Sequence, residues 1–111
     1  MKMSEVVTLL ASTGLPYAYH QFPEGTGIQP PFICFYYGGA DDVLADNTNY
    51  VRARSLTIEL YEDQDRPLAY FDTLADALSG AGLVYSHEVT DIDSEKMHLT
   101  TFYMEGLFSY E

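Results

Sequence analysis

The sequence is poor in basic residues, with five Lys and Arg against seventeen Asp and Glu and a net charge of −12 at pH 7. Binding to a nucleic-acid backbone or to an anionic membrane surface depends on Lys and Arg, so this balance argues against both. Cysteine is also scarce, because Cys34 stands alone, and this excludes an internal disulfide and a multi-cysteine zinc site. The apolar run from Val6 to Ala11 is too short to span a bilayer, and we interpret it as part of an amphipathic first helix.

Apolar and aromatic residues, by contrast, are plentiful enough for one core. The 111 residues are 47% hydrophobic and include ten Tyr and six Phe, which predicts a single domain over residues 1–111. Helical spacing and strand alternation predict elements in this chain order: helix 4–13, strands 17–22, 32–37 and 50–61, helix 65–80, and strands 84–92 and 97–108. This α-β-β-β-α-β-β order indicates an α+β fold, with a mainly antiparallel sheet of about five strands and two helices on one face.

Local signals set the expected boundaries of the helices. Ser4 is expected to cap the first helix, with Gly14 as its stop. Asp65 is expected to cap the second helix, with Pro67 near its first position and Leu68 on its apolar side. A polar loop is expected over residues 38–49.

The strands carry more apolar surface than two helices can cover. Strands 32–37 and 97–108 look apolar on both faces, so a second cover is expected from another subunit. Tyr and Arg are enriched in such contacts. The expected interface residues are Tyr36, Tyr37, Tyr50, Arg52 and Arg54. The alternative is that the tyrosines pack inside the monomer with their hydroxyl groups at the rim.

Patterns typical of a metal site are weak. His87 and His98 are expected to reach each other at most as a partial site across the terminal hairpin, whereas structural zinc needs four ligands. The polar loop contains Asp41, Asp42, Asp46 and Asn47, but their spacing differs from that of an EF-hand. A solvated loop is the simpler interpretation. We therefore predict no metal site.

Patterns typical of catalysis are also weak. Cys34 has no basic neighbour that would activate it, and a mid-strand cysteine is usually a small core residue. The acidic cluster of Glu59, Glu62, Asp63 and Asp65 is a candidate for acid–base chemistry, but a solvated turn with a helix cap is the simpler interpretation. We predict no catalytic residue and no cofactor, with a small enzyme subunit as a less favoured alternative.

Several short stretches, taken together in order, resemble one family. They are Leu15-Pro-Tyr-Ala-Tyr19, Phe22-Pro-Glu-Gly25, Pro30-Pro-Phe32, Ala45-Asp46 with Tyr50, Ile58-Glu-Leu-Tyr61 and Ser94-Glu-Lys-Met97. In these stretches, which span about residues 15–105, the chain resembles the tail-terminator (tail-completion) and head–tail joining proteins of siphophages and prophages. The resemblance implies a small α/β subunit of a ring, usually six-fold, which caps the tail tube and joins it to the head. It brings no catalytic residue and no cofactor.

The resemblance also implies the partners and the location. These are the chain itself, the major tail tube protein and the head–tail connector, in a virion that is assembled in the bacterial cytoplasm. A head-completion or stopper protein on the connector side is the alternative. Six copies would together carry a charge of −72, so a lumen of that sign would repel DNA passing through the ring. No specific nucleic-acid binding and no membrane contact are expected.

Overall fold

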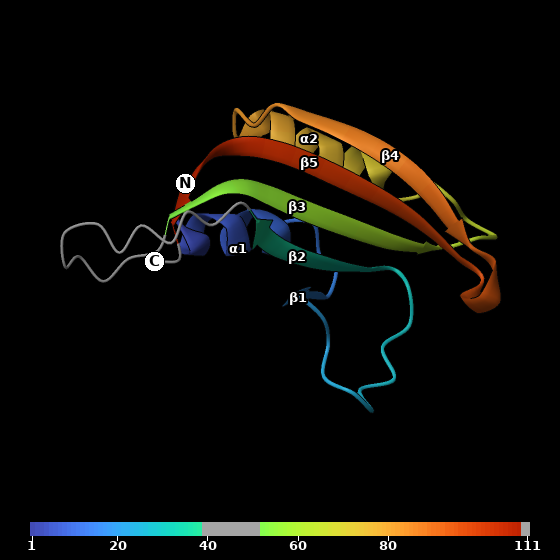
Figure 1. Cartoon of the computed structure of the whole chain (residues 1–111). Coiled ribbons are helices and arrows are strands. Elements are labelled where there is room, and N and C mark those ends of the chain that lie inside the picture. Colours follow the sequence, from blue (N-terminus) through green and yellow to red (C-terminus); the bar gives the residue numbers. More distant parts are fainter. Residues whose placement is uncertain (39–51, 110–111) are drawn as a thin grey trace.

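Two helices and five strands form the fold in a computed structural model that describes residues 1–38 and 52–109 (Figure 1). The helices are α1 (Met3–Ala11) and α2 (Phe71–Gly80). The strands are β1 (Tyr17–Tyr19), β2 (Phe32–Gly38), β3 (Arg52–Asp63), β4 (Tyr85–Ile92) and β5 (Met97–Ser109), with the short 3-10 helix η2 (Asp93–Glu95) between the last two. The predicted α+β class and element order are confirmed.

The strands form one curved sheet in the order β1-β2-β3-β5-β4. β1 runs parallel to β2, and the other three pairings are antiparallel. The long strands β3 and β5 therefore lie inside the sheet, while β1 and β4 form its two edges. This arrangement is the mainly antiparallel sheet that the alternating patterns predict.

Both helices pack on the same face of the sheet, behind it in the view of Figure 1. Apolar residues recur at every second position of β3, and Leu56, Ile58 and Leu60 are all fully buried beneath the helices. Phe102 and Met104 of β5 join them, as the alternation predicts. From the helices, the core receives Val6, Leu10, Leu74 and Leu78. Burial of these side chains is the main force that holds the two layers together.

The first helix begins one residue earlier than expected and ends two residues earlier. α1 covers Met3–Ala11, so Ser4 lies inside the helix and the predicted Ser4 cap is wrong. Lys2 is the N-cap residue instead, and its backbone N–H donates a hydrogen bond of 2.9 Å to the Glu5 carboxylate. A glutamate at the third helical position accepts the backbone N–H of the N-cap residue in this way in a capping box.

The second helix begins later than expected, at Phe71. The Asp65 cap is wrong because the Asp65 backbone N–H donates to Asp63 Oδ1 at 3.0 Å, which stabilises a turn instead. Leu68 adopts a positive φ of 65° and is 53% exposed, so it lies outside the apolar side of the helix. Helical spacing alone therefore placed Leu68 incorrectly, since the backbone turns before the periodic segment becomes helical.

Strand boundaries also shift. The strand predicted over residues 17–22 ends at Tyr19, where His20 takes a positive φ of 70°. The strand predicted over residues 50–61 is observed as β3 (Arg52–Asp63), which ends two residues later than predicted, while residues 50 and 51 lie outside the described part. Gly38 belongs to β2, and the rest of the predicted polar loop lies outside the described residues.

Candidate functional site: the helix-free face of the sheet

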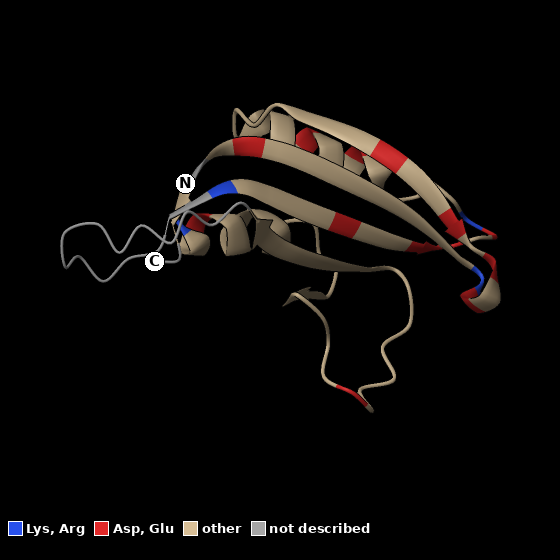
Figure 2. Cartoon of the chain, in the orientation of Figure 1, with Lys and Arg blue, Asp and Glu red and all other residues tan. Residues whose placement is uncertain are grey.

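The face of the sheet opposite α1 and α2, here called the helix-free face, is the candidate binding surface. Strand register places its side chains in rows that cross four strands. Two neighbouring rows are Cys34–Glu59–Thr101–Glu88 and Tyr36–Thr57–Tyr103–Ser86. Figure 2 shows acidic positions on β3, β4 and β5. The face therefore combines tyrosine rings with carboxylates.

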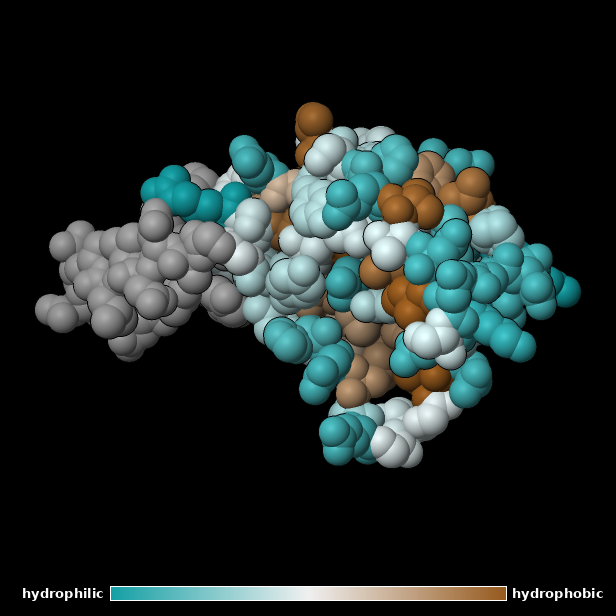
Figure 3. Space-filling model, turned by 45° about the vertical axis from the view of Figure 1, so that its right-hand side comes forward, coloured by the Kyte–Doolittle hydropathy of each residue, from teal (hydrophilic) through white to brown (hydrophobic). Residues whose placement is uncertain are grey.

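The segment of residues 20–31 between β1 and β2 lies beside this face and forms a groove with it. We call it the Glu59 groove. It has a volume of about 680 Å³, and its lining includes Phe22, Ile28, Cys34, Tyr36, Glu59 and Tyr61. Figure 3 shows hydrophobic atoms exposed in the hollow above this segment. A concave surface with apolar walls and few polar groups is typical of binding sites.

The segment 20–31 supplies part of the cover that the sequence pattern assigns to another subunit. Phe22 packs edge-on against Phe32, with ring centroids 5.5 Å apart. Phe32 in turn stacks on Tyr61 at 4.8 Å. As a result, Phe32 is only 8% exposed and Cys34 only 5%. The prediction that strand 32–37 lacks a cover on this face is thus wrong for its first residues, because the chain folds back over them.

Two glutamates on the helix-free face accept hydrogen bonds from tyrosines. The Tyr61 hydroxyl donates to Glu59 Oε1 at 3.2 Å, and the Tyr103 hydroxyl donates to Glu88 Oε1 at 2.6 Å. Burial, and then the nearby Glu59 charge, raise the pKa of Cys34 to about 11. The same two causes raise the pKa of Tyr61. The hydrogen bond to Glu88 raises the pKa of Tyr103.

The five residues expected at a subunit interface fall in different places. Tyr36 lies half-buried in the groove of the helix-free face. Tyr37 points to the opposite face, where it is buried, stacks on Phe108 and donates its hydroxyl proton to the Ser109 carbonyl at 3.3 Å. Tyr37 therefore has little surface left for another subunit, as in the alternative in which tyrosines pack inside. Arg54 is exposed near the start of β3, while Tyr50 and the Arg52 side chain lie outside the described part.

The acidic cluster predicted around residues 59–65 does not come together. Glu59 and Glu62 belong to opposite faces of β3, so their carboxylates are not a catalytic pair. Glu62 is 1% exposed, and its Oε2 accepts the Tyr70 backbone N–H at 2.8 Å, just before α2. This carboxylate helps to position the helix rather than to line the Glu59 groove.

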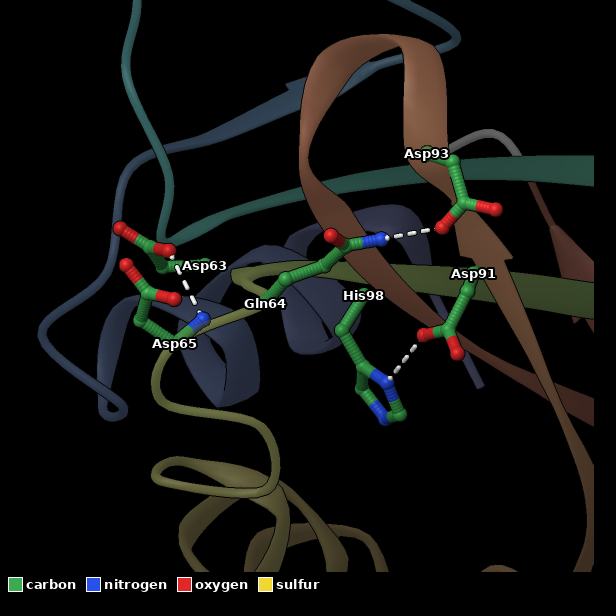
Figure 4. Close-up of polar contacts among 6 residues, drawn as sticks. All are labelled: Asp63, Gln64, Asp65, Asp91, Asp93 and His98. Carbon is green, nitrogen blue, oxygen red and sulfur yellow. Dashed lines mark hydrogen bonds and ion pairs between the residues drawn. The ribbon is translucent and has the colours of Figure 1, made fainter.

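A second polar cluster was not predicted from the sequence. His98 lies opposite Asp91 on one side and Glu62 on the other, whereas His87 lies opposite Phe102, so the predicted facing of the two histidines is wrong. His98 Nδ1 lies 2.9 Å from Asp91 Oδ1, and Figure 4 shows the two side chains pointing toward each other. Glu62 Oε1 and His98 Nε2 are buried without a hydrogen-bond partner. One signal was available, since Glu62 continues the alternation of Leu60 and therefore belongs on the core face.

Neither cluster has the composition of a metal centre. Within the residues that the structure describes, no three His, Cys, Asp or Glu side chains gather as metal ligands. The loop with Asp41, Asp42, Asp46 and Asn47 lies outside those residues. Among the described helices, none combines the length and the apolar character needed to cross a membrane.

Comparison with known proteins assigns no family to the chain. No family model matches the sequence, and no curated protein matches it. The functional conclusion therefore depends on the residues and their arrangement, together with the resemblance carried by the short stretches described above.

Proposed function

We propose that the chain is a structural protein of phage or prophage assembly, a tail terminator that forms a ring. In this role it caps the tail tube and joins it to the head, and it acts through protein contacts rather than catalysis. Each subunit must then present one surface to a neighbouring copy and another to a different protein. The edge strand β4 is the observation that carries the first requirement.

β4 offers an open edge for another chain. It is eight residues long, and its six central residues are all exposed. Among the described strands it pairs with β5 alone. It contains no proline and no lysine, the residues that often protect an edge from pairing. Its two carboxylates are held by other side chains, Glu88 by Tyr103 and Asp91 by His98.

A ring needs a contact between two different surfaces of the subunit. The sheet has edges on opposite sides, with β4 at one and β1 at the other. A contact that joins the β4 edge of one subunit to the β1 side of the next is therefore head-to-tail, and it closes into a ring when the rotation per subunit allows it. This leaves the helix-free face available to a tail tube or connector protein.

The first test is native mass, measured by light scattering behind a sizing column over a wide range of concentration. We expect a species that approaches six times the 12.5-kDa protomer mass as concentration rises. Electron microscopy of that species should show rings. A monomer at every concentration, both alone and with purified tail tubes, would overturn the ring.

A second assay separates the tail-terminator role from the head-completion or stopper role. Purified tail tubes and DNA-filled heads are each incubated with the chain and pelleted. Binding to tubes supports the tail terminator, whereas binding only to heads would replace it with the stopper. Binding to neither would contradict both roles.

A further inference from the structure

The Glu59 groove has a floor and a wall that come from separate parts of the chain. Cys34 and Tyr36 of β2, with Glu59 and Tyr61 of β3, form the floor. Phe22 of the segment 20–31 contributes to the wall. Its volume of about 680 Å³ is large enough for a long side chain with part of its backbone.

Glu59 is a carboxylate without a cation. Its one hydrogen bond comes from the Tyr61 hydroxyl at 3.2 Å, and within the described part of the chain no Lys or Arg pairs with it. A carboxylate accepts about four hydrogen bonds, so most of its capacity is unused. The negative charge also acts on its surroundings, since it contributes to the raised pKa of Cys34 and of Tyr61 after burial. A cation bound beside Glu59 would offset this negative charge.

The strands around the groove supply no positive charge of their own. β2, β4 and β5 contain no Lys or Arg, and β3 has Arg52 and Arg54 at its start. At ~3.3 Å per strand residue, Arg54 lies roughly 16 Å along β3 from Glu59. Lys96 lies between the lining residues Glu95 and Met97, but it is exposed and does not itself line the groove. A complementary charge for Glu59 must therefore come from another molecule.

The groove also offers aromatic rings beside the carboxylate. Tyr36 and Tyr61 both line it, and Tyr61 is held in place by its stack with Phe32 at 4.8 Å. Ring faces attract cations, and arginine gains most because its flat guanidinium group both stacks on rings and makes paired hydrogen bonds to a carboxylate. The ammonium group of a lysine would neutralise the charge of Glu59, but it lacks the flat shape that stacks on a tyrosine ring.

We propose that the Glu59 groove binds an arginine side chain presented by a partner protein. A second copy of the chain is a poor source, because two helix-free faces that each carry Glu59 and Glu88 repel each other. The inference deepens the proposed function by naming the chemistry of the partner contact. It rests on that function only in assuming that the chain acts by protein contact.

The test uses a small probe, so that it does not depend on ring formation. The isotope-labelled full chain is titrated with N-acetyl-arginine amide and, separately, with the citrulline analogue, which has the same shape without the charge. We expect NMR shift changes at Tyr36, Glu59 and Tyr61 with the arginine probe, and about tenfold weaker binding of citrulline. Raising the salt concentration should weaken arginine binding.

Two variants with the same chemical change provide the matched comparison. Glu59→Gln should weaken arginine binding about tenfold, because a charge-assisted pair becomes a neutral contact. Glu88→Gln is the control, since Glu88 also lies on the helix-free face and accepts a tyrosine hydroxyl, but does not line the groove. It should change binding by less than about twofold. If Glu59→Gln does not fold, Tyr36→Leu takes its place and should weaken binding several-fold.

Three results would overturn the proposal. These are equal binding of the two probes, unchanged arginine binding in Glu59→Gln, and shift changes that centre on Glu88. If arginine does not bind, but the Glu59→Gln variant has a lower native mass than the unmodified chain, the occupant of the groove is a second copy. Failure of ring formation with intact arginine binding would instead contradict the proposed ring and leave this inference standing.

Discussion

His98 Nδ1 lies 2.9 Å from Asp91 Oδ1, which joins β5 to the edge strand β4 through a side-chain contact (Figure 4). The imidazole is largely buried, with a side-chain exposure of 11%, while the carboxylate is 59% exposed. On the other side of His98, Glu62 is its register partner in β3. Three strands therefore bring polar side chains together at the end of the sheet near the start of α2, although only His98 and Asp91 are in hydrogen-bonding contact.

Asp91→Asn should weaken the attachment of the edge strand. The substitution keeps the shape of the side chain but replaces a charge-assisted contact with a neutral one, so we expect a loss of about 1 kcal/mol in the free energy of unfolding. Urea denaturation measures it. Asp76→Asn on α2 is the control, because Asp76 is exposed and should change stability by less than about 0.5 kcal/mol. Equal effects of the two substitutions would contradict a stabilising role for this pair.

Stability should fall as the pH rises from about 9 to about 11. Burial raises the pKa of Cys34 from its ordinary value of 9.0 to about 11 in the folded chain, so in this range the folded chain holds a proton that the unfolded chain has lost. The stabilising contribution of the protonated thiol is therefore complete below pH 9 and is lost as the pH rises through 11. Urea midpoints at several pH values measure this slope.

Cys34→Ala provides the comparison for the pH series. Because the pKa of Tyr61 is also raised by burial and by Glu59, part of the slope should remain in this variant. The difference between the slopes of the unmodified chain and of Cys34→Ala measures the contribution of Cys34 to the pH dependence of stability. A slope that is the same with and without the thiol would show that the thiol does not contribute.

Leu68→Gly should stabilise the protein. Leu68 has a φ of 65° and is 53% exposed, so glycine removes an unfavourable backbone conformation and little packing. We expect a gain of about 0.5–1 kcal/mol in the free energy of unfolding. Had the helix begun before this residue, as the spacing predicts, glycine would instead cost about 1 kcal/mol. Leu68→Ala, which keeps the positive φ, should show no gain.

Val89→Lys should reduce the native mass of the assembly. Val89 is 49% exposed on β4, and a lysine on an edge strand opposes pairing with another chain. Thr73→Lys is the matched control, since Thr73 is exposed on α2 and the substitution adds the same charge. The control should keep the mass of the unmodified chain. Unchanged mass in Val89→Lys would place the subunit contact away from the β4 edge.

Local patterns were sufficient for the elements and their faces. The alternation of Leu56, Ile58 and Leu60 marks the core side of β3, and the same period of two puts Tyr103 and Phe102 on opposite sides of β5. Boundaries were less accurate where backbone conformation opposes the pattern. Leu68 has helical spacing, but the hydrogen bond from the Asp65 backbone to Asp63 forms a turn before it. Such competition between local hydrogen bonds is not visible in apolar periodicity.

The candidate site was harder to predict, because its parts are distant in sequence. Tyr36 was expected at an interface from its residue type alone, and its neighbour Tyr37 shared that expectation although the two side chains point to opposite faces. Glu59 was grouped with Glu62 because they are close in the chain, yet the sheet separates them. Closeness in the sequence was therefore a poor guide to which side chains meet, because strand alternation determines the face that each side chain occupies.

The amino-acid sequence by itself determined the α+β class, the order of the elements and the acidic character, because each follows from local periodicity or from composition. Only the tertiary structure decided that Phe22 folds back over Phe32 and that Glu59 meets no Lys or Arg among the described side chains. It also decided that His98 meets Asp91 rather than His87. The physical reason is that strand register and loop path are chosen by the packing of the whole core, which no single segment specifies.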